Sequence, residues 1–524
     1  ALPISPRSLC TGTRRRKVTV VRVACVQMRA GEPGDRRTTA DRILGFLERS
    51  AREGAELVVF PEAAYPAYYI GPGMDRARTL VAESEEFLDA VSRKARSLGV
   101  YVAIGVLCPE WDGRISNSAF LIDPEGMILA QARKNNMWHF DSRYVCQGHE
   151  YPVVPTPLGV VGLMVCADGR APEIARILAL KGADIILDLA NLTGSGSLSN
   201  PQVEYMLPAR ARENAVWLVV ADKVGLESKT VLNCGSSRVI DPWGRIAASL
   251  DAREEAILHA AIDVSLPRPT LPPRHPERYS LLVSKRDPLP RRDLSPYREL
   301  LCGIVQYPFR SGEEYGTKAK EFLEILQDQG YSVICLPRLE PDGSHDDVVR
   351  ALLPYIDDGH LVVFGVSGKA KNCGVTFISS GGVNAVFGGN DAVKARDTPL
   401  LRCGALFGDE GFVPEAARCL MLDGAEVVFW YDTGHDQAAE LLARTRAAEN
   451  RVYFVRMCSI SSNDSACIVA PNGNVIASTV SGEEMATGAM ITPVLSSMKI
   501  VVPGTDVVGN RFPEDYRVLA DVSS

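Results

Sequence analysis

Runs of apolar residues alternate along the chain with longer segments in which apolar side chains recur every three or four positions. The run Val18–Met28 is rich in Val and predicts a strand. A helix is expected after it, because Ile43, Leu44 and Leu47 share one helical face. Further elements predicted in this way are strands at Leu57–Phe60, Tyr101–Leu107, Ser118–Ile122, Met127–Arg133, Gly159–Val165 and Ile185–Leu189, and helices at Ser84–Leu98 and from Pro172.

The connections between these elements indicate the class of fold. Asp123–Gly126 is a turn sequence between two strand segments and predicts a hairpin. Elsewhere strands and helices alternate, as they do where helices join parallel strands. This mixture favours an α/β layered sandwich over a purely parallel sheet.

The same order of signals returns after a segment at 265–296 that is rich in Pro, Arg and Ser. Short segments on either side of it match in collinear pairs, more often than chance would supply. The pairs are Cys25–Gln27 with Ile304–Gln306, Leu57–Pro61 with Ser332–Pro337, Asn117 with Asn372, Pro172–Arg176 with Pro414–Arg418, Glu213–Asn214 with Glu449–Asn450, Asp241–Gly244 with Ala470–Gly473, and Pro276–Tyr279 with Pro513–Tyr516. The chain is therefore predicted to contain one domain of roughly 250 residues twice.

This repeat divides the chain into four predicted parts. They are a basic tail at 1–17, a first domain at 18–264, an extended arm or linker at 265–299 and a second domain at 300–524. The tail is rich in Arg and lacks the apolar stretch of a secretory signal, so we expect the cytoplasm as the location.

Composition narrows the classes of protein. The 524 residues carry 57 Lys and Arg against 64 Asp and Glu, a formal net charge of −7. This mildly acidic balance disfavours nucleic acid as a partner. No apolar run approaches the roughly 18 residues of a membrane span, so no membrane partner is expected. The 13 Cys form no C-x-x-C pair and the seven His no H-E-x-x-H pattern, so we expect reduced thiols and no metal.

Three chemically versatile residues directly follow predicted strands in the first copy. Glu62, Lys134 and Cys166 each stand where an apolar run ends, and the carboxyl ends of strands are where α/β folds form their sites. A thiol needs a base to become an attacking thiolate, and a carboxylate can serve. An ammonium group can stabilise the oxyanion that such an attack creates.

The residues around these three positions carry a family resemblance. The matching segments are Phe60–Glu62, Arg133–Lys134, Cys166-x-Asp168-x-Arg170, Arg210–Asn214 and Asp241-Pro242-x-Gly244. On them the first copy, over about residues 18–285, resembles the nitrilase superfamily of carbon–nitrogen hydrolases, and by repetition the resemblance extends more weakly to the C-terminus.

The resemblance implies a four-layer αββα sandwich in each domain and a catalytic triad of Glu62, Lys134 and Cys166. Glu62 would act as general base and then acid, Lys134 would stabilise the oxyanion, and Cys166 would form a thioester. The substrate would be a small amide or a ureide such as an N-carbamoyl compound, with no cofactor.

Supporting roles are expected for five further residues. The backbone N–H of Ala167 would join the oxyanion site, and Asp141, where many relatives carry Glu, would orient Lys134 or the substrate amine. Arg170 would bind a substrate carboxylate, since its planar fork suits one, although a structural pairing with Asp168 is equally compatible with the sequence. Asn191 and Tyr65 are candidates to line the pocket.

Departures from the family pattern bear on the substrate. Asn136 replaces a frequent His, and Ala167 and Asp168 replace the Trp and Glu that nitrilases tend to carry after the Cys. Amide or carbamoyl substrates are therefore favoured over nitriles. The alternatives are a nitrilase, an amide-forming acyltransferase on the same triad, or a non-catalytic scaffold.

The second copy lacks the triad. Arg338 stands at the position of Glu62, Gly408 at that of Cys166, and Gly389 or Asn390 at that of Lys134. No thioester chemistry is expected there. Because relatives dimerise through the helices that follow the Cys strand, the copies are predicted to stack as an internal pseudo-dimer, with a further homo-oligomer left open.

Overall fold

The structure is a computed structural model and falls into two compact units. It describes residues 20–194, 199–285, 289–290, 298–339, 345–367, 374–388, 393–432, 436–458 and 464–522. The predicted tail 1–17, Asn372 and the pair Gly389–Asn390 lie outside these residues. Unit 1 comprises residues 1–271 and 502–505, and unit 2 comprises 272–501 and 506–524.

Unit 1 contains two sheets that pack face to face. In spatial order the first is β15 (Ala256–Asp263), β1 (Val20–Gln27), β2 (Leu57–Val59), β3 (Tyr101–Pro109), β4 (Ile115–Ile122) and β5 (Ile128–Arg133), with β6 (Val145–Cys146) beside β4. The second is β14 (Ile246–Ser249), β13 (Arg238–Ile240), β10 (Trp217–Ala221), β9 (Ile185–Leu189), β8 (Gly159–Val165) and β7 (Val153–Thr156). A separate hairpin joins β11 (Val224–Glu227) to β12 (Val231–Cys234).

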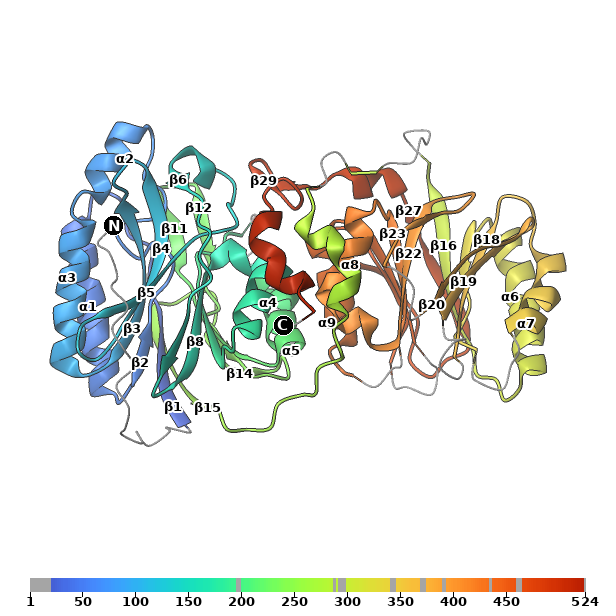
Figure 1. Cartoon of the computed structure of the whole chain (residues 1–524), viewed down its shortest axis with the longest axis horizontal. Coiled ribbons are helices and arrows are strands. Elements are labelled where there is room, and N and C mark those ends of the chain that lie inside the picture. The colour runs from blue at the N-terminus through green and yellow to red at the C-terminus, as the bar shows by residue number, and fades with distance from the viewer. Residues whose placement is uncertain are drawn as a thin grey trace. The chain divides into compact units, whose positions relative to one another are not determined.

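Helices cover the outer face of each sheet of unit 1 (Figure 1). The first sheet is covered by α1 (Arg36–Arg52) and α3 (Ser84–Leu98), with α2 (Met74–Val81) beside them, and the second by α4 (Pro172–Leu180) and α5 (Leu207–Asn214). This is the four-layer αββα arrangement, so the predicted layered α/β sandwich is confirmed.

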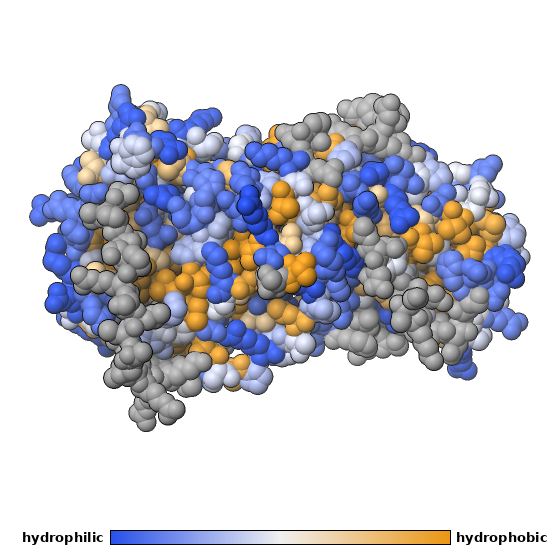
Figure 2. Space-filling view, viewed as in Figure 1, coloured by the Kyte–Doolittle hydropathy of each residue, from blue (hydrophilic) through white to orange (hydrophobic). Residues whose placement is uncertain are grey.

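Helix α3 illustrates how the sequence produces these layers. Its residues Phe87, Leu88, Val91 and Ala95 recur every three or four positions and are buried against the first sheet. The helix ends at Gly99, whose φ of 68° is the left-handed conformation that a helix C-terminus favours. Figure 2 shows the opposite consequence of the pattern, since hydrophilic side chains gather over α1 and α3.

Strand direction brings the candidate residues to one region. β1, β2 and β3 run parallel, β5 runs in the same direction through two antiparallel pairings, and β8, β9 and β10 are parallel to one another. The segments after β2 and β9 are joined directly, because the Glu62 N–H donates to the Ala190 carbonyl at 3.2 Å. The ends of β2, β5 and β8 are thus the place to look for a site.

Unit 2 repeats this architecture, which confirms the predicted tandem repeat. Its sheets are β20 (Gly382–Gly388), β19 (Gly374–Ser379), β18 (Leu361–Val366), β17 (Val333–Cys335), β16 (Leu300–Gln306) and β27 (Met485–Ile491), and β21 (Arg396–Asp397), β22 (Arg402–Phe407), β23 (Val427–Tyr431), β24 (Tyr453–Met457), β25 (Cys467–Val469) and β26 (Val475–Ser478). The helices are α6 (Gly312–Asp328) and α7 (His345–Leu352) on one sheet, and α8 (Pro414–Leu422) and α9 (Ala439–Asn450) on the other. None of the described helices is both long and apolar enough to cross a membrane.

Candidate active site

Glu62 and Lys134 form a buried ion pair at the ends of β2 and β5. The Lys134 Nζ donates to the Glu62 Oε1 at 2.7 Å, and both side chains are 0% exposed. Asn117 on β4 donates its Nδ2 to the same oxygen at 2.6 Å. The other oxygen, Oε2, is buried without a hydrogen-bond partner in the described part of the chain. Glu62 therefore has one oxygen fixed and one available to a reacting group.

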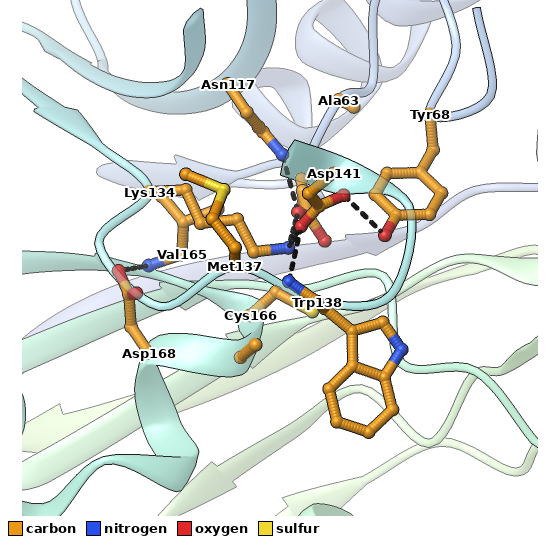
Figure 3. A network of polar contacts seen from close by, with 12 residues as sticks. Ala63, Tyr68, Asn117, Lys134, Met137, Trp138, Asp141, Val165, Cys166 and Asp168 are labelled. Atoms are coloured by element: carbon orange, nitrogen blue, oxygen red, sulfur yellow. Dashed lines mark hydrogen bonds and ion pairs between the residues drawn. The ribbon is translucent and has the colours of Figure 1, made fainter. Parts of the chain in front are cut away.

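A second carboxylate, Asp141, also contacts the ammonium group of Lys134 (Figure 3). Its Oδ2 is 2.7 Å from the Lys134 Nζ and accepts the Trp138 N–H at 2.9 Å, and its Oδ1 accepts the Tyr68 hydroxyl at 2.8 Å. Burial alone would lower the pKa of Lys134, but the Asp141 and Glu62 carboxylates raise this pKa well above its usual value. Lys134 is therefore a charged ammonium group at neutral pH.

Cys166 begins the 3₁₀ turn Cys166–Arg170 that follows β8. Its φ of 53° is left-handed and unfavourable for a residue with a Cβ. The turn is held on both sides, since the Cys166 N–H donates to the Asp188 Oδ1 at 2.8 Å and its carbonyl accepts the Gln202 Nε2 at 2.8 Å. A strained, tightly held residue at a strand end is typical of a functional position.

The Cys166 thiol is protonated at rest. Burial raises its pKa well above the usual value, the Glu62 charge raises it further, and Lys134 opposes both effects. The resting thiol is therefore a weak nucleophile, and a neighbouring base that takes its proton during attack would activate it. The charges of Glu62 and Lys134 therefore both act on the Cys166 thiol.

The turn residues Ala167, Asp168 and Arg170 are also placed. The Ala167 carbonyl accepts the Asn136 Nδ2 at 2.8 Å. Asp168 accepts backbone N–H groups from Asn135, Asn136 and Val165 at 2.7–3.0 Å, and burial raises the pKa of its carboxyl to about 7.

The side chain of Arg170 lies against an aromatic ring. Its guanidinium carbon stands 5.1 Å from the ring centroid of Trp138, and the residue is 9% exposed. Because Trp138 also donates its N–H to Asp141, Arg170 is packed on a residue of the same polar network.

Two residues, Asn191 and Tyr65, are expected from the sequence to line the pocket, and of these only Asn191 lies next to Cys166. Asn191 follows β9 and is buried, its backbone hydrogen bond lowers the pKa of Cys166, and both polar atoms of its amide lack a partner in the described residues. Tyr65 lies elsewhere: its ring stacks on Phe87 with centroids 4.0 Å apart, in the core between the first sheet and its helices. Tyr68, three residues later, reaches Asp141 instead.

Tyr68, Asn117, Trp138 and Asp188 belong to the network although the sequence did not single them out as site residues. Asp188 gave a usable signal, because an acidic residue inside the apolar run Ile185–Leu189 must be buried and needs a partner. Tyr68 and Trp138 lie in connecting segments, where no periodicity fixes the direction of a side chain. Within the described residues, no cluster of His, Cys, Asp and Glu has the makings of a metal site.

Comparison with known proteins gives the family. A carbon–nitrogen hydrolase family model matches residues 22–270 and 359–496. A nitrilase of Pyrococcus abyssi is 32% identical over 257 residues, covering 48% of this chain and 92% of that protein. A Homo sapiens omega-amidase is 26% identical over 258 residues, covering 47% and 90% respectively. A crystallised amidase from Nesterenkonia sp. has 25% identity and a TM-score of 0.44, covering 48% of this chain and 94% of that one.

The two matched segments lie one in each copy of the repeated domain and together span more than half of the chain. The first includes Glu62, Lys134 and Cys166 with their surrounding network, and the second includes the substituted position Gly408. The chain is thus a tandem member of the carbon–nitrogen hydrolase family.

Proposed function

We propose that the first copy hydrolyses small amide or N-carbamoyl compounds through a thioester on Cys166, with Glu62 and Lys134 completing the triad. The observation that carries the proposal is the buried group itself. A carboxylate with one unpartnered oxygen and a fully charged lysine both act electrostatically on a protonated, strained cysteine. Such a combination is costly to bury and is typical of catalysis rather than of packing.

The first half of the reaction uses all three groups. Glu62 takes the thiol proton as Sγ attacks the carbonyl carbon, and the Lys134 ammonium with the Ala167 N–H stabilises the resulting oxyanion. Glu62 then gives the proton to the leaving nitrogen, and the C–N bond breaks to release ammonia or an amine. The acyl group remains on Cys166 as a thioester.

The second half regenerates the enzyme with water. Glu62 takes a proton from a water molecule as its oxygen attacks the thioester carbon, and the same proton returns to the sulfur as the C–S bond breaks. The carboxylic acid product leaves. Asp141 remains paired with Lys134 throughout, which keeps the ammonium group at the oxyanion position.

Residues around Cys166 support the proposed substrate class. The unpartnered amide of Asn191 supports a polar substrate group, and the Arg170 guanidinium supports a carboxylate at the far end of the substrate. Omega-amidases among the relatives support an amide as the scissile group. A nitrilase among them makes nitriles the class to test against it.

Ammonia release across a matched panel of amides, ureides and nitriles tests the proposal, with Cys166→Ala as the blank. We expect release from amides or ureides, strongest where the substrate bears a carboxylate, and an acyl adduct on Cys166 in mass spectra of the acid-quenched wild type. Release from nitriles alone would overturn the substrate class. Equal rates in wild type and Cys166→Ala would overturn the mechanism.

A further inference from the structure

A short segment from the far end of the chain belongs to the unit that contains the candidate active site. Residues 502–505 are part of unit 1 although in sequence they come after β27, the last strand in the two sheets of the second copy. They lie in the hairpin of β28 (Ile500–Val502) and β29 (Thr505–Asp506). Thr505 is 3% exposed, and its hydroxyl forms hydrogen bonds with the loop after Lys134.

One hydroxyl group of this segment binds the backbone on both sides of Trp138. The Thr505 Oγ1 donates to the Met137 carbonyl at 3.0 Å and accepts the His139 N–H at 2.9 Å. Thr505 is thus a clamp on the peptide segment that contains Trp138.

The backbone of this loop has an unfavourable conformation that the bonds to Thr505 help to hold. His139 has a φ of 49°, a left-handed conformation that is unfavourable for a residue with a Cβ. Gly504 allows the close approach: its φ is 88°, and a Cβ there would lie 2.2 Å from the His139 carbonyl oxygen. A residue with a side chain at 504 would therefore push the two segments apart.

The clamped residue is connected directly to the candidate catalytic lysine. The Trp138 N–H donates to the Asp141 Oδ2, and the same oxygen pairs with the Lys134 Nζ (Figure 3). The Trp138 carbonyl in turn accepts the Asp141 N–H at 3.0 Å, which closes the turn. A shift of the Trp138 peptide would therefore move Asp141 and the ammonium group with it.

We propose that Thr505 is a positioning residue for the active site, acting through Trp138 and Asp141 on Lys134. The inference rests on the proposed function of Glu62, Lys134 and Cys166, and it goes further by giving the C-terminal end of the chain a part in the reaction. The Trp138 ring also supports the Arg170 guanidinium, so the clamp fixes one face of the expected carboxylate site.

Three substitutions in the full-length chain test the clamp. Thr505→Val keeps the shape and removes both hydrogen bonds, so we expect kcat/KM to fall about tenfold, in line with two lost hydrogen bonds. Thr505→Ser keeps the hydroxyl and should restore most of the rate. Gly504→Ala should lower the rate as Thr505→Val does, because it separates the segments without touching the hydroxyl.

A matched control separates positioning from general destabilisation. Thr479 is also 3% exposed and its hydroxyl also makes buried hydrogen bonds, but it lies in unit 2. Thr479→Val should leave kcat/KM within about twofold of wild type, whatever its melting temperature. If Thr505→Val and Thr479→Val lower the melting temperature alike and neither changes kcat/KM or its pH profile, the proposal is wrong.

Hydrogen exchange separates this inference from the proposed function. The His139 N–H donates to Thr505 and the Trp138 N–H donates to Asp141, so Thr505→Val should accelerate exchange of a peptide covering residues 137–139 by releasing the first bond and loosening the second. Faster exchange in a protein that hydrolyses no substrate of the panel would support the clamp and overturn the function. Unchanged exchange and unchanged rates in an active enzyme would overturn the clamp alone.

Discussion

The turn after β8 in the first copy and the turn after β22 in the second have the same backbone but different chemistry. Cys166 has a φ of 53° and Gly408 a φ of 55°, and each begins a 3₁₀ turn that leads into a helix starting with Pro. The third residue of each turn, Asp168 or Glu410, accepts the backbone N–H of the residue before the turn at 3.0 Å. The second copy therefore has the same backbone turn and the same hydrogen bond as the first, but it lacks the nucleophile.

The strands next to these turns, β9 in the first copy and β23 in the second, carry different side chains at one equivalent position. Strand register places Asp188 and Trp430 at equivalent positions, since each pairs two residues before the turn. Asp188 accepts the Cys166 N–H, whereas the Trp430 Nε1 donates to the Gly408 carbonyl at 2.8 Å. The indole is fully buried, and a Cβ on Gly411 would collide with it. A packed ring thus occupies the place of a polar group.

The turn in the second copy forms without the cysteine side chain. Glycine adopts a left-handed φ at little cost, but cysteine does not. The first copy therefore keeps a strained residue that the second shows to be dispensable for the turn, which is expected where strain serves function.

The largest effect is expected from placing Gln at equivalent positions of the two copies. Glu62→Gln removes the proposed base and should lower amide hydrolysis by about 1,000-fold or more. Arg338→Gln, at the equivalent position of the second copy, should leave the rate within about twofold of wild type. Steady-state ammonia release measures both. A similar loss in the two variants would show that the second copy takes part in the chemistry.

A buried Arg–Glu pair provides the next test, because both copies have kept it. Arg210 pairs with Glu213 on α5 and its Nε donates to the Gly169 carbonyl at 3.0 Å; Arg446 pairs with Glu449 on α9 and its Nε donates to the Gly411 carbonyl at 3.2 Å. Replacing either Arg by Ala removes a buried charged partner of the Glu carboxylate and should cost about 3–5 kcal/mol of unfolding free energy.

Denaturant unfolding, followed with activity of the folded protein, measures this prediction. Arg210→Ala should lower activity as well as stability, because Gly169 belongs to the turn of Cys166. Arg446→Ala should lower stability alone. Retention of full stability in either variant would contradict a shared structural role for the pair.

The sequence predicts the layers and the three central residues for a physical reason. Strands such as β2 and β8 are buried almost entirely, so they appear as apolar runs, and Glu62, Lys134 and Cys166 are conspicuous because each follows such a run. The side chains that hold them could not be predicted in the same way. Trp138 lies in a loop, and Thr505 comes from a part of the chain that no local pattern links to it.

Tyr65 is a residue expected in the pocket whose side chain packs in the hydrophobic core instead. It lies close to Glu62 in sequence, but sequence proximity does not fix the direction of a side chain after a strand has ended. The aromatic ring gains more by stacking on Phe87 in the core than by facing a polar group. Three residues further on, the hydroxyl of Tyr68 finds a carboxylate partner and is buried with it.

A smaller effect is expected from removing the charge of Asp141. It gives Lys134 a second carboxylate partner, and Asp141→Asn keeps the shape while removing that charge. We expect kcat/KM to fall by about 10- to 100-fold, the value of a lost charged hydrogen bond. The pKa of Lys134 should move down, because one of the two charges that raise it is gone. A pH–rate profile with its alkaline limb unchanged would contradict this.

The smallest expected effect concerns the reactivity of Cys166 itself. The Glu62 charge raises the pKa of the thiol, so Glu62→Gln should lower that pKa and increase the thiolate fraction at pH 8. Alkylation of Cys166 by iodoacetamide, mapped by mass spectrometry, should therefore be several-fold faster in a variant that has lost hydrolysis. Cys146, half-buried and apart from the triad, provides the internal control and should react equally in both proteins. Slower alkylation of Cys166 would mean that Glu62 promotes thiolate formation at rest, and the protonated resting thiol inferred for the first copy would be wrong.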